Sequence, residues 1–188
     1  MHIIAGCNGA GKTTAAKNIM PGIFKVNQFV NADEIAKGLS PFNPESVAIE
    51  AGRIMLRRID ELLEKDNSFT IETTLSTLSY SRTIEKAHQK GFNVFLLYFW
   101  LSSPELAIQR VATRVSEGGH NIPEDVIRRR YSKSIKNLFN IFIPICDIWQ
   151  IYDNSENPRR LIGSGIRTSH EIIKDTALFQ KIKDYGRG

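Results

Sequence analysis

Short apolar runs alternate along the chain with longer stretches in which apolar residues recur at helical spacing. Five of the short runs are typical of buried strands, and most of them end in polar residues. These predicted strands cover residues 1–5, 29–33, 68–74, 93–101 and 147–152. In parallel sheets the ligand lies beyond the carboxyl ends of the strands, so the polar strand ends indicate where a site should form.

The stretches between these runs predict amphipathic helices. A helix over 44–65 has Pro44 in its first turn and Asn43 as a cap. Its apolar face consists of Val47, Ala51, Ile54, Met55, Ile59, Leu62 and Leu63. Further helices are predicted over 14–19, 80–90, 104–117, 122–142 and 170–183. The helix over 122–142 carries the apolar stripe Ile127, Tyr131, Ile135, Leu138 and Phe142.

Strands that alternate with helices in this way predict an α/β fold, with a parallel five-stranded sheet and helices on both faces. Residues 159–168 are compatible with a small extra strand or hairpin. The 188 residues suit a single domain, 1–188, and no repeat, low-complexity stretch or linker divides them. No apolar run approaches the length of a membrane span, so no membrane association is expected.

A phosphate-binding motif, G-x-x-x-x-G-K-[ST], follows the first predicted strand. Its glycines allow the backbone N–H groups to surround a polyphosphate at the positive end of the next helix. The predicted ATP-binding residues are Gly6, Asn8, Gly9, Ala10, Gly11, Lys12, Thr13 and Thr14. Lys12 should reach the β- and γ-phosphates, and the Thr13 hydroxyl should ligate Mg²⁺. The fold class is therefore a P-loop NTPase three-layer sandwich.

Other signatures narrow the class of P-loop protein. A transporter ATPase also needs a Leu-Ser-Gly-Gly motif and an apolar strand that ends in Asp-Glu, and the sequence contains neither. The Asn-Lys-x-Asp motif of guanine-specific switches is absent as well. The remaining layout is that of a small kinase, which combines a phosphate loop, an acid after the second strand and a basic lid.

The lid is predicted over residues 110–131. Arg110 and Arg114 are four residues apart and share a helix face, and Gly118-Gly119 offers a hinge between two helices. Cations in a lid can stabilise charge during phosphoryl transfer and exclude water. Arg128 and Arg130 flank the buried stripe and are predicted to bind ATP, whereas the residue between them should point nearest to solvent. The alternative is a solvated basic helix surface.

Two acids at strand ends are the candidate chemical groups. Asp33 is placed to take the proton of a hydroxyl acceptor, although it could instead cap a helix from Ile35 onward. Glu72 is an unusual strand residue, and its alternative role is that of a buried partner for a lid arginine. His120 could contact phosphate or act as a capping or hinge residue.

Charge and cysteine content add two expectations. The net charge of +5 is compatible with nucleic acid, but the arginines gather near one segment, which favours a site for several phosphates. Nucleic acid is therefore an unlikely partner. The chain has two cysteines, Cys7 and Cys146, so a disulfide framework is not expected and a reducing cytoplasm is the natural compartment.

In this order, the loop, the Val30–Asp33 and Ile71–Thr74 strand ends and the Arg114–Tyr131 lid resemble the zeta toxin family, in particular its short, stand-alone branch. The resemblance covers residues 1 to about 155. It implies transfer of the ATP γ-phosphate, with Mg²⁺, to a hydroxyl of a UDP-N-acetylamino sugar, typically UDP-N-acetylglucosamine. It also implies that a protein antitoxin could be a partner.

The same resemblance implies roles for individual residues. Asp33 matches the catalytic base, and Glu72, with Thr73 and Thr74, matches the substrate-holding segment. Lys12 and Thr13 match the phosphate and Mg²⁺ ligands, and Arg110 and Arg114 are the nearest matches to the catalytic lid arginines.

Two alternatives stay open. One is a kinase for another hydroxyl acceptor, such as a nucleoside, an antibiotic or an RNA end. The other is a nucleotide-dependent switch that hydrolyses ATP slowly without an acceptor. The pair of acids distinguishes them, because a switch needs neither acid at an acceptor pocket.

Overall fold

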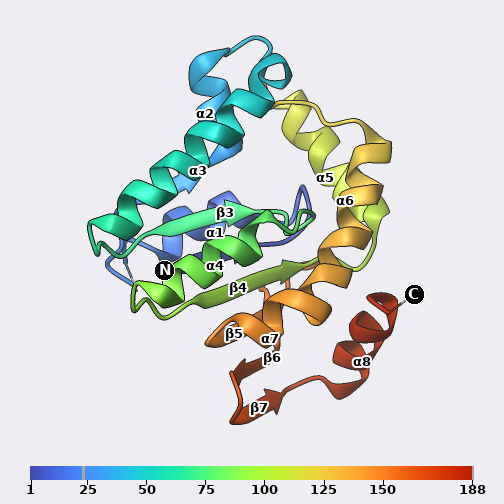
Figure 1. Cartoon of the computed structure of the whole chain (residues 1–188). Coiled ribbons are helices and arrows are strands. Elements are labelled where there is room, and N and C mark those ends of the chain that lie inside the picture. Colours follow the sequence, from blue (N-terminus) through green and yellow to red (C-terminus); the bar gives the residue numbers. More distant parts are fainter. Residues whose placement is uncertain (23, 188) are drawn as a thin grey trace.

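The computed structural model describes residues 1–22 and 24–187 of the chain. Its centre is a sheet with the strand order β2-β3-β1-β4-β5-β6-β7, and helices flank it (Figure 1). The five predicted strands are confirmed and all pair in parallel. They are β1 (His2–Ala5), β2 (Phe29–Asn31), β3 (Thr70–Thr73), β4 (Phe95–Trp100) and β5 (Ile148–Asp153).

Two antiparallel strands, β6 (Arg160–Ile166) and β7 (His170–Ile173), extend the sheet beyond β5. The predicted final helix over 170–183 is therefore wrong in its first part. Residues 170–173 pair with β6 instead. Their two isoleucines are compatible with a strand as well as with a helix, so the sequence pattern alone is ambiguous here. The helix itself is α8 (Thr176–Tyr185), and it begins where the Asp175 side chain accepts a hydrogen bond from the Leu178 N–H at 2.9 Å.

The helices largely follow the predicted pattern. They are α1 (Lys12–Ile19), α2 (Ala32–Leu39), α3 (Ala48–Glu64), α4 (Ser79–Gln89), α5 (Pro104–Ser116), α6 (Glu124–Asn137) and the short α7 (Ile143–Ile145). A 3₁₀ turn, Pro44–Val47, precedes α3, and a π-helical turn, Leu138–Phe142, separates α6 from α7. Several boundaries differ from the prediction, two of them near the site. The second strand ends at Asn31 because this residue caps α2, and the helix predicted from Pro44 is α-helical only from Ala48.

The core lies between the sheet and these helices. The predicted stripe of α6 and the following turn is buried, as is most of β4. Two tyrosines join the layers: the Tyr98 hydroxyl lies 2.8 Å from the Ser134 hydroxyl, and the Tyr131 hydroxyl donates to the Leu101 carbonyl at 2.7 Å. Both cysteines are buried and free, as expected. Within the described residues, no helix is both long enough and apolar enough to traverse a membrane.

His2 should make the stability of the fold depend on pH. It is buried on β1 against the rings of Phe24 and Phe95, and its Nδ1 has no hydrogen-bond partner among the described residues. Burial lowers the pKa of His2 from 6.5 to about 4. Between these two values the unfolded chain binds more protons than the folded protein, so stability should fall as the pH falls.

Between about pH 7 and about pH 4.5, we expect the free energy of unfolding of the parent to fall by up to about 3 kcal/mol more than that of His2→Phe, since one pKa unit corresponds to about 1.36 kcal/mol. Urea unfolding at the two pH values measures this difference. His170→Phe, which changes an exposed histidine on β7, is the control and should keep the parental pH dependence. An equal loss of stability in His2→Phe and the parent would contradict the assignment.

Candidate active site

The predicted site residues gather around one cavity at the carboxyl ends of the parallel strands. Its volume is about 760 Å³. The phosphate loop forms one wall, α2 and the Pro44–Val47 turn form the opposite wall, and residues of α5, α6 and their connection complete it. Of the predicted residues, the lining includes Asn8, Gly9, Gly11, Lys12, Thr13, Thr14, Asp33, Glu72, Arg110, Arg114 and Arg130.

The phosphate loop has a backbone that only glycine adopts easily. Gly6 has φ +140°, and a Cβ there would lie 2.2 Å from the Phe99 carbonyl oxygen of β4. Gly11, with φ +77°, immediately precedes α1, and no side chain of the described residues caps this helix end. The first N–H groups of α1 are thus left for an anion. Cys7 is buried in the loop, and burial raises the pKa of its thiol to about 11, so it stays neutral.

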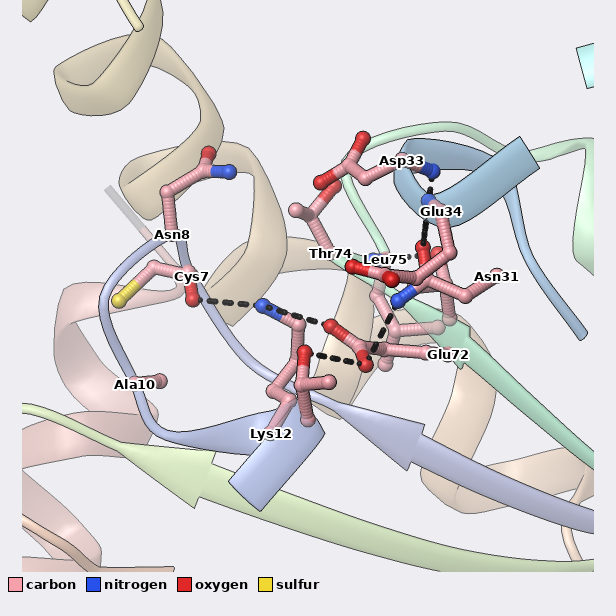
Figure 2. A network of polar contacts seen from close by, with 12 residues as sticks. Cys7, Asn8, Ala10, Lys12, Asn31, Asp33, Glu34, Glu72, Thr74 and Leu75 are labelled. Atoms are coloured by element: carbon pink, nitrogen blue, oxygen red, sulfur yellow. Dashed lines mark hydrogen bonds and ion pairs between the residues drawn. The ribbon is translucent and has the colours of Figure 1, made fainter. Parts of the chain in front are cut away.

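Glu72 is the centre of a buried polar network (Figure 2). One carboxylate oxygen accepts from the Thr13 hydroxyl at 2.8 Å and from Asn31 Nδ2 at 2.9 Å. The other oxygen lies 3.8 Å from the Lys12 ammonium, which also donates to the Cys7 carbonyl at 2.9 Å. None of the partners found in the described part of the chain is a lid arginine, so that alternative for Glu72 is wrong.

Strand pairing explains this arrangement. In the parallel register of β1 and β3, Glu72 lies opposite Ile4, just before the phosphate loop begins. The strand β3 also pairs with β2, which places Asn31 opposite Glu72 on the other side. Glu72 is therefore held between the phosphate loop and the start of α2. A hydroxyl and a carboxylate side by side next to a phosphate-binding loop are oxygen donors of the kind that Mg²⁺ prefers.

Asp33 lies in the first turn of α2, at the cavity and close to this network (Figure 2). It does not cap the helix. The cap is Asn31, whose side-chain oxygen accepts from the N–H groups of Asp33 at 2.8 Å and Glu34 at 3.4 Å. Asp33 is exposed, and its carboxylate is available at the cavity rather than committed to the helix end.

Thr73 and Thr74 serve the turn after β3. The Thr73 hydroxyl accepts from the Leu75 N–H at 3.0 Å, and the Thr74 hydroxyl lies 2.8 Å from the Ser76 hydroxyl. Neither residue lines the cavity described above. The structure thus brings Glu72 to the cavity but leaves the two threonines outside its lining, where their hydroxyls make hydrogen bonds within the turn after β3.

Arg110 connects the lid to the base of the site. Its guanidinium donates to the carbonyls of Asn154 and Ser155, both at 2.8 Å, while it also lines the cavity. The Asn154 side chain in turn donates to the Ala10 carbonyl of the phosphate loop at 2.9 Å. Residues that follow β5 therefore support the loop and α5 together.

Arg114 and His120 organise the connection between the two lid helices. Arg114 donates to the His120 carbonyl at 2.8 Å, and both residues line the cavity. The His120 imidazole lies 3.5 Å from the Glu45 carboxylate, in the 3₁₀ turn of the opposite wall. His120 thus makes a contact across the cavity mouth that no local sequence signal indicates.

The three consecutive arginines of α6 diverge. Arg128 is exposed, forms an ion pair with Glu105 of α5 and is absent from the cavity lining. Arg129, expected to point nearest to solvent, is exposed but lines the cavity. Arg130 also lines it and donates to the Asn8 side chain at 3.4 Å. The correction has a simple cause: Glu105 on the neighbouring helix attracts Arg128 away from the site.

We expect Arg114→Ala to lower the turnover rate by about tenfold or more and to weaken ATP affinity less, because a cation contributes most where charge moves in the transition state. Steady-state kcat and KM for ATP measure this split. Arg82→Ala, an exposed arginine of α4 outside the cavity lining, is the control. An unchanged kcat with a lower melting temperature would identify Arg114 as a structural residue.

Comparison with known proteins identifies the family of the chain. A family model described as zeta toxin matches residues 1–157. An uncharacterized protein of Haemophilus influenzae is 32% identical over 126 residues, which are 67% of this chain and 88% of that protein.

Two solved structures share the fold. A chain of the AvrRxo1-ORF1:-ORF2 complex with ATP aligns with a TM-score of 0.81 at 18% identity, over 97% of this chain and 62% of that chain. This chain therefore spans less than two thirds of that one. A structure of the PezAT chromosomal toxin–antitoxin system of Streptococcus pneumoniae aligns with a TM-score of 0.66 at 19% identity, over 98% and 85% of the two chains. The predicted α/β fold and the resemblance are confirmed, and the chain belongs to the zeta toxin family.

Proposed function

We propose that this protein is an ATP-dependent kinase that transfers the γ-phosphate to a hydroxyl group of a UDP-N-acetylamino sugar. Membership of the zeta toxin family supports a kinase. The observation that carries the proposal is the placement of two carboxylates, Asp33 and Glu72, at one cavity with the phosphate-loop residues Lys12 and Thr13. An acceptor hydroxyl next to the γ-phosphate would meet a carboxylate that can take its proton.

The residues would divide the work as follows. Lys12 and the loop N–H groups would hold the β- and γ-phosphates. Thr13 and Glu72 would hold Mg²⁺, which would neutralise phosphate charge. Asp33 orients the acceptor hydroxyl. The oxygen of the acceptor hydroxyl attacks the γ-phosphorus, and the hydroxyl proton passes to Asp33. The bond between the γ-phosphorus and the bridging β-phosphate oxygen breaks, which releases ADP. Arg114 and Arg130 face the phosphates from the lid, and Arg110 holds the lid to the loop.

The ATP assignment is supported by the loop and by the structural likeness to a complex that was solved with ATP. The sugar nucleotide is proposed from the resemblance of the sequence motifs to the zeta toxin family. The cavity of about 760 Å³ lies within the range of small-molecule sites, roughly 300–1,000 Å³. An antitoxin partner is part of the proposal, since the similar solved structures belong to a two-protein complex and a toxin–antitoxin system. We also propose that residues 1–188 act as one domain, with 110–131 as its lid, in the cytoplasm.

An acceptor screen with γ-labelled ATP tests the function. The purified protein is incubated with UDP-sugars, nucleosides and short RNAs, and label transfer is measured. We expect transfer to UDP-N-acetylglucosamine or a related UDP-N-acetylamino sugar. Transfer to a nucleoside or an RNA end alone would show that the acceptor is not a UDP-sugar. ATP hydrolysis without a labelled acceptor would show that the protein is a nucleotide-dependent switch and not a kinase.

A further inference from the structure

A single buried side chain connects the two acids of the cavity. Asn31 is only 6% exposed, and its amide uses both ends. The Nδ2 group donates to Glu72 at 2.9 Å, and the Oδ1 atom accepts from the Asp33 N–H at 2.8 Å and the Glu34 N–H at 3.4 Å. An aspartate or a serine would cap α2 equally well, since these residues are preferred at this position too. The helix alone therefore does not require an amide.

The donor half of the amide matters because of what happens to Glu72 when nucleotide binds. The same Glu72 oxygen accepts from Thr13, whose hydroxyl is the expected Mg²⁺ ligand, and its other oxygen faces Lys12, the expected phosphate ligand. Both groups are expected to turn towards Mg·ATP. Of the Glu72 partners among the described residues, Asn31 is then the hydrogen-bond donor that is not expected to turn towards the nucleotide.

We infer that Asn31 is a positioning residue for phosphoryl transfer, which holds the Glu72 carboxylate beside the phosphate loop and the Asp33-bearing turn of α2 in one geometry. The inference rests on the proposed function of Asp33 and Glu72. Because reacting groups must be held within a fraction of an ångström, loss of this link should reduce turnover much more than nucleotide binding.

Two substitutions separate this role from helix capping. Asn31→Ser and Asn31→Asp both keep a cap oxygen, but neither retains the amide donor. We expect Asn31→Ser to lower turnover by about tenfold or more at every pH, with the Kd for ATP measured without Mg²⁺ changed by less than about threefold. A cap that is only structural predicts parental turnover in both variants.

Asn31→Asp keeps the cap oxygens and replaces the amide donor by a second carboxylate beside Glu72. Two like charges at this distance repel each other, so this variant should displace Glu72 and lower turnover at least as strongly as Asn31→Ser. Parental turnover in either variant would overturn the inference.

Further controls keep the test independent of folding and of the acceptor. Asp175→Ser changes the cap of the remote helix α8 and should keep parental turnover. In a Glu72→Gln background, Asn31→Ser should add little further loss if Asn31 acts through Glu72, whereas additive losses would contradict the inference. Phosphate release and transfer are both measured. If the parent only hydrolyses ATP, the kinase proposal fails, while the ratios between variants still report on Asn31.

Discussion

Asp33→Asn is expected to lower phosphoryl transfer by on the order of a hundredfold or more, the usual contribution of a positioned acid or base. Asparagine has the size of aspartate but cannot take the acceptor proton. Nucleotide binding should persist, because Lys12, Thr13 and the loop N–H groups are unchanged and Asn31, not Asp33, caps α2. Single-turnover transfer of labelled phosphate and calorimetric titration with ATP measure the two quantities separately.

Glu34→Gln is the matched control for this substitution. Glu34 is the other acid in the first turn of α2, so its loss removes the same charge from the same helix end. At exposed positions, such a charge stabilises a helix by about 0.3–1 kcal/mol. We expect it to leave transfer within about threefold of the parent. If Asp33→Asn transfers or hydrolyses at the parental rate, Asp33 is not the base. If in addition no UDP-sugar accepts phosphate, a nucleotide-binding protein is the better description.

Lys12→Ala is expected to weaken ATP binding by roughly tenfold to a hundredfold, because each hydrogen bond from a charged donor contributes about 1.5–3 kcal/mol. Turnover should fall further, since the negative charge on the transferred phosphate loses its nearest cation. The structure adds a second consequence. Among the described residues, Lys12 is the cation that forms an ion pair with the buried Glu72, at 3.8 Å, so its removal leaves that carboxylate without a positive partner there.

Lys12→Met separates the loss of charge from the loss of volume, since it keeps roughly the volume of the side chain and removes the charge. Both variants should lose ATP affinity, and the alanine variant should also lose more thermal stability because of the cavity it creates. Lys133→Ala, on an exposed lysine of α6 outside the cavity lining, is the control and should have a much smaller effect. Parental ATP affinity and turnover in both Lys12 variants would disprove the phosphate-loop assignment.

The geometry also refines what the family resemblance implies for Glu72. The resemblance assigns this acid to the acceptor, whereas its nearest contacts are Thr13, Lys12 and Asn31. It lines the cavity as well, so a role towards the acceptor stays a prediction. The contacts favour a carboxylate that orders the proposed Mg²⁺ ligand Thr13 and is connected, through Asn31, to the proposed base Asp33.

Features that depend on neighbouring residues in the chain were predictable. The phosphate loop follows from glycines at fixed spacing, and a strand before it and a helix after it complete the unit. The stripe of α6 and the face of α3 follow from helical periodicity, because one buried face is enough to specify such a helix. The strand–helix alternation then limits the fold to a parallel sheet with flanking helices.

Features that depend on the pairing of strands and the packing of helices could not be predicted from the sequence. The strand β3 lies between β1 and β2, so Glu72 meets residues about 60 and 40 positions away, a juxtaposition that no spacing in the sequence encodes. The sequence pattern predicts helix for β7 because four residues with two isoleucines fit either period, and the edge of β6 decides for a strand. Arg128 lies outside the cavity lining because an acid on α5 pairs with it, whereas Arg129 is exposed as expected and also lines the cavity.

By itself, the sequence determined the chemistry present: a polyphosphate loop, two acids at strand ends and a set of arginines, each tied to local backbone conformation and short-range periodicity. Only the tertiary structure decided which of these groups meet. Strand order placed Glu72 against the loop, the cap of α2 left Asp33 at the cavity, and helix packing selected the arginines that line it. The physical reason is that contacts between distant segments arise from the packing of whole elements, whose energy is spread over many apolar side chains. The polar residues that this packing brings together therefore have no local sequence pattern that predicts their contact.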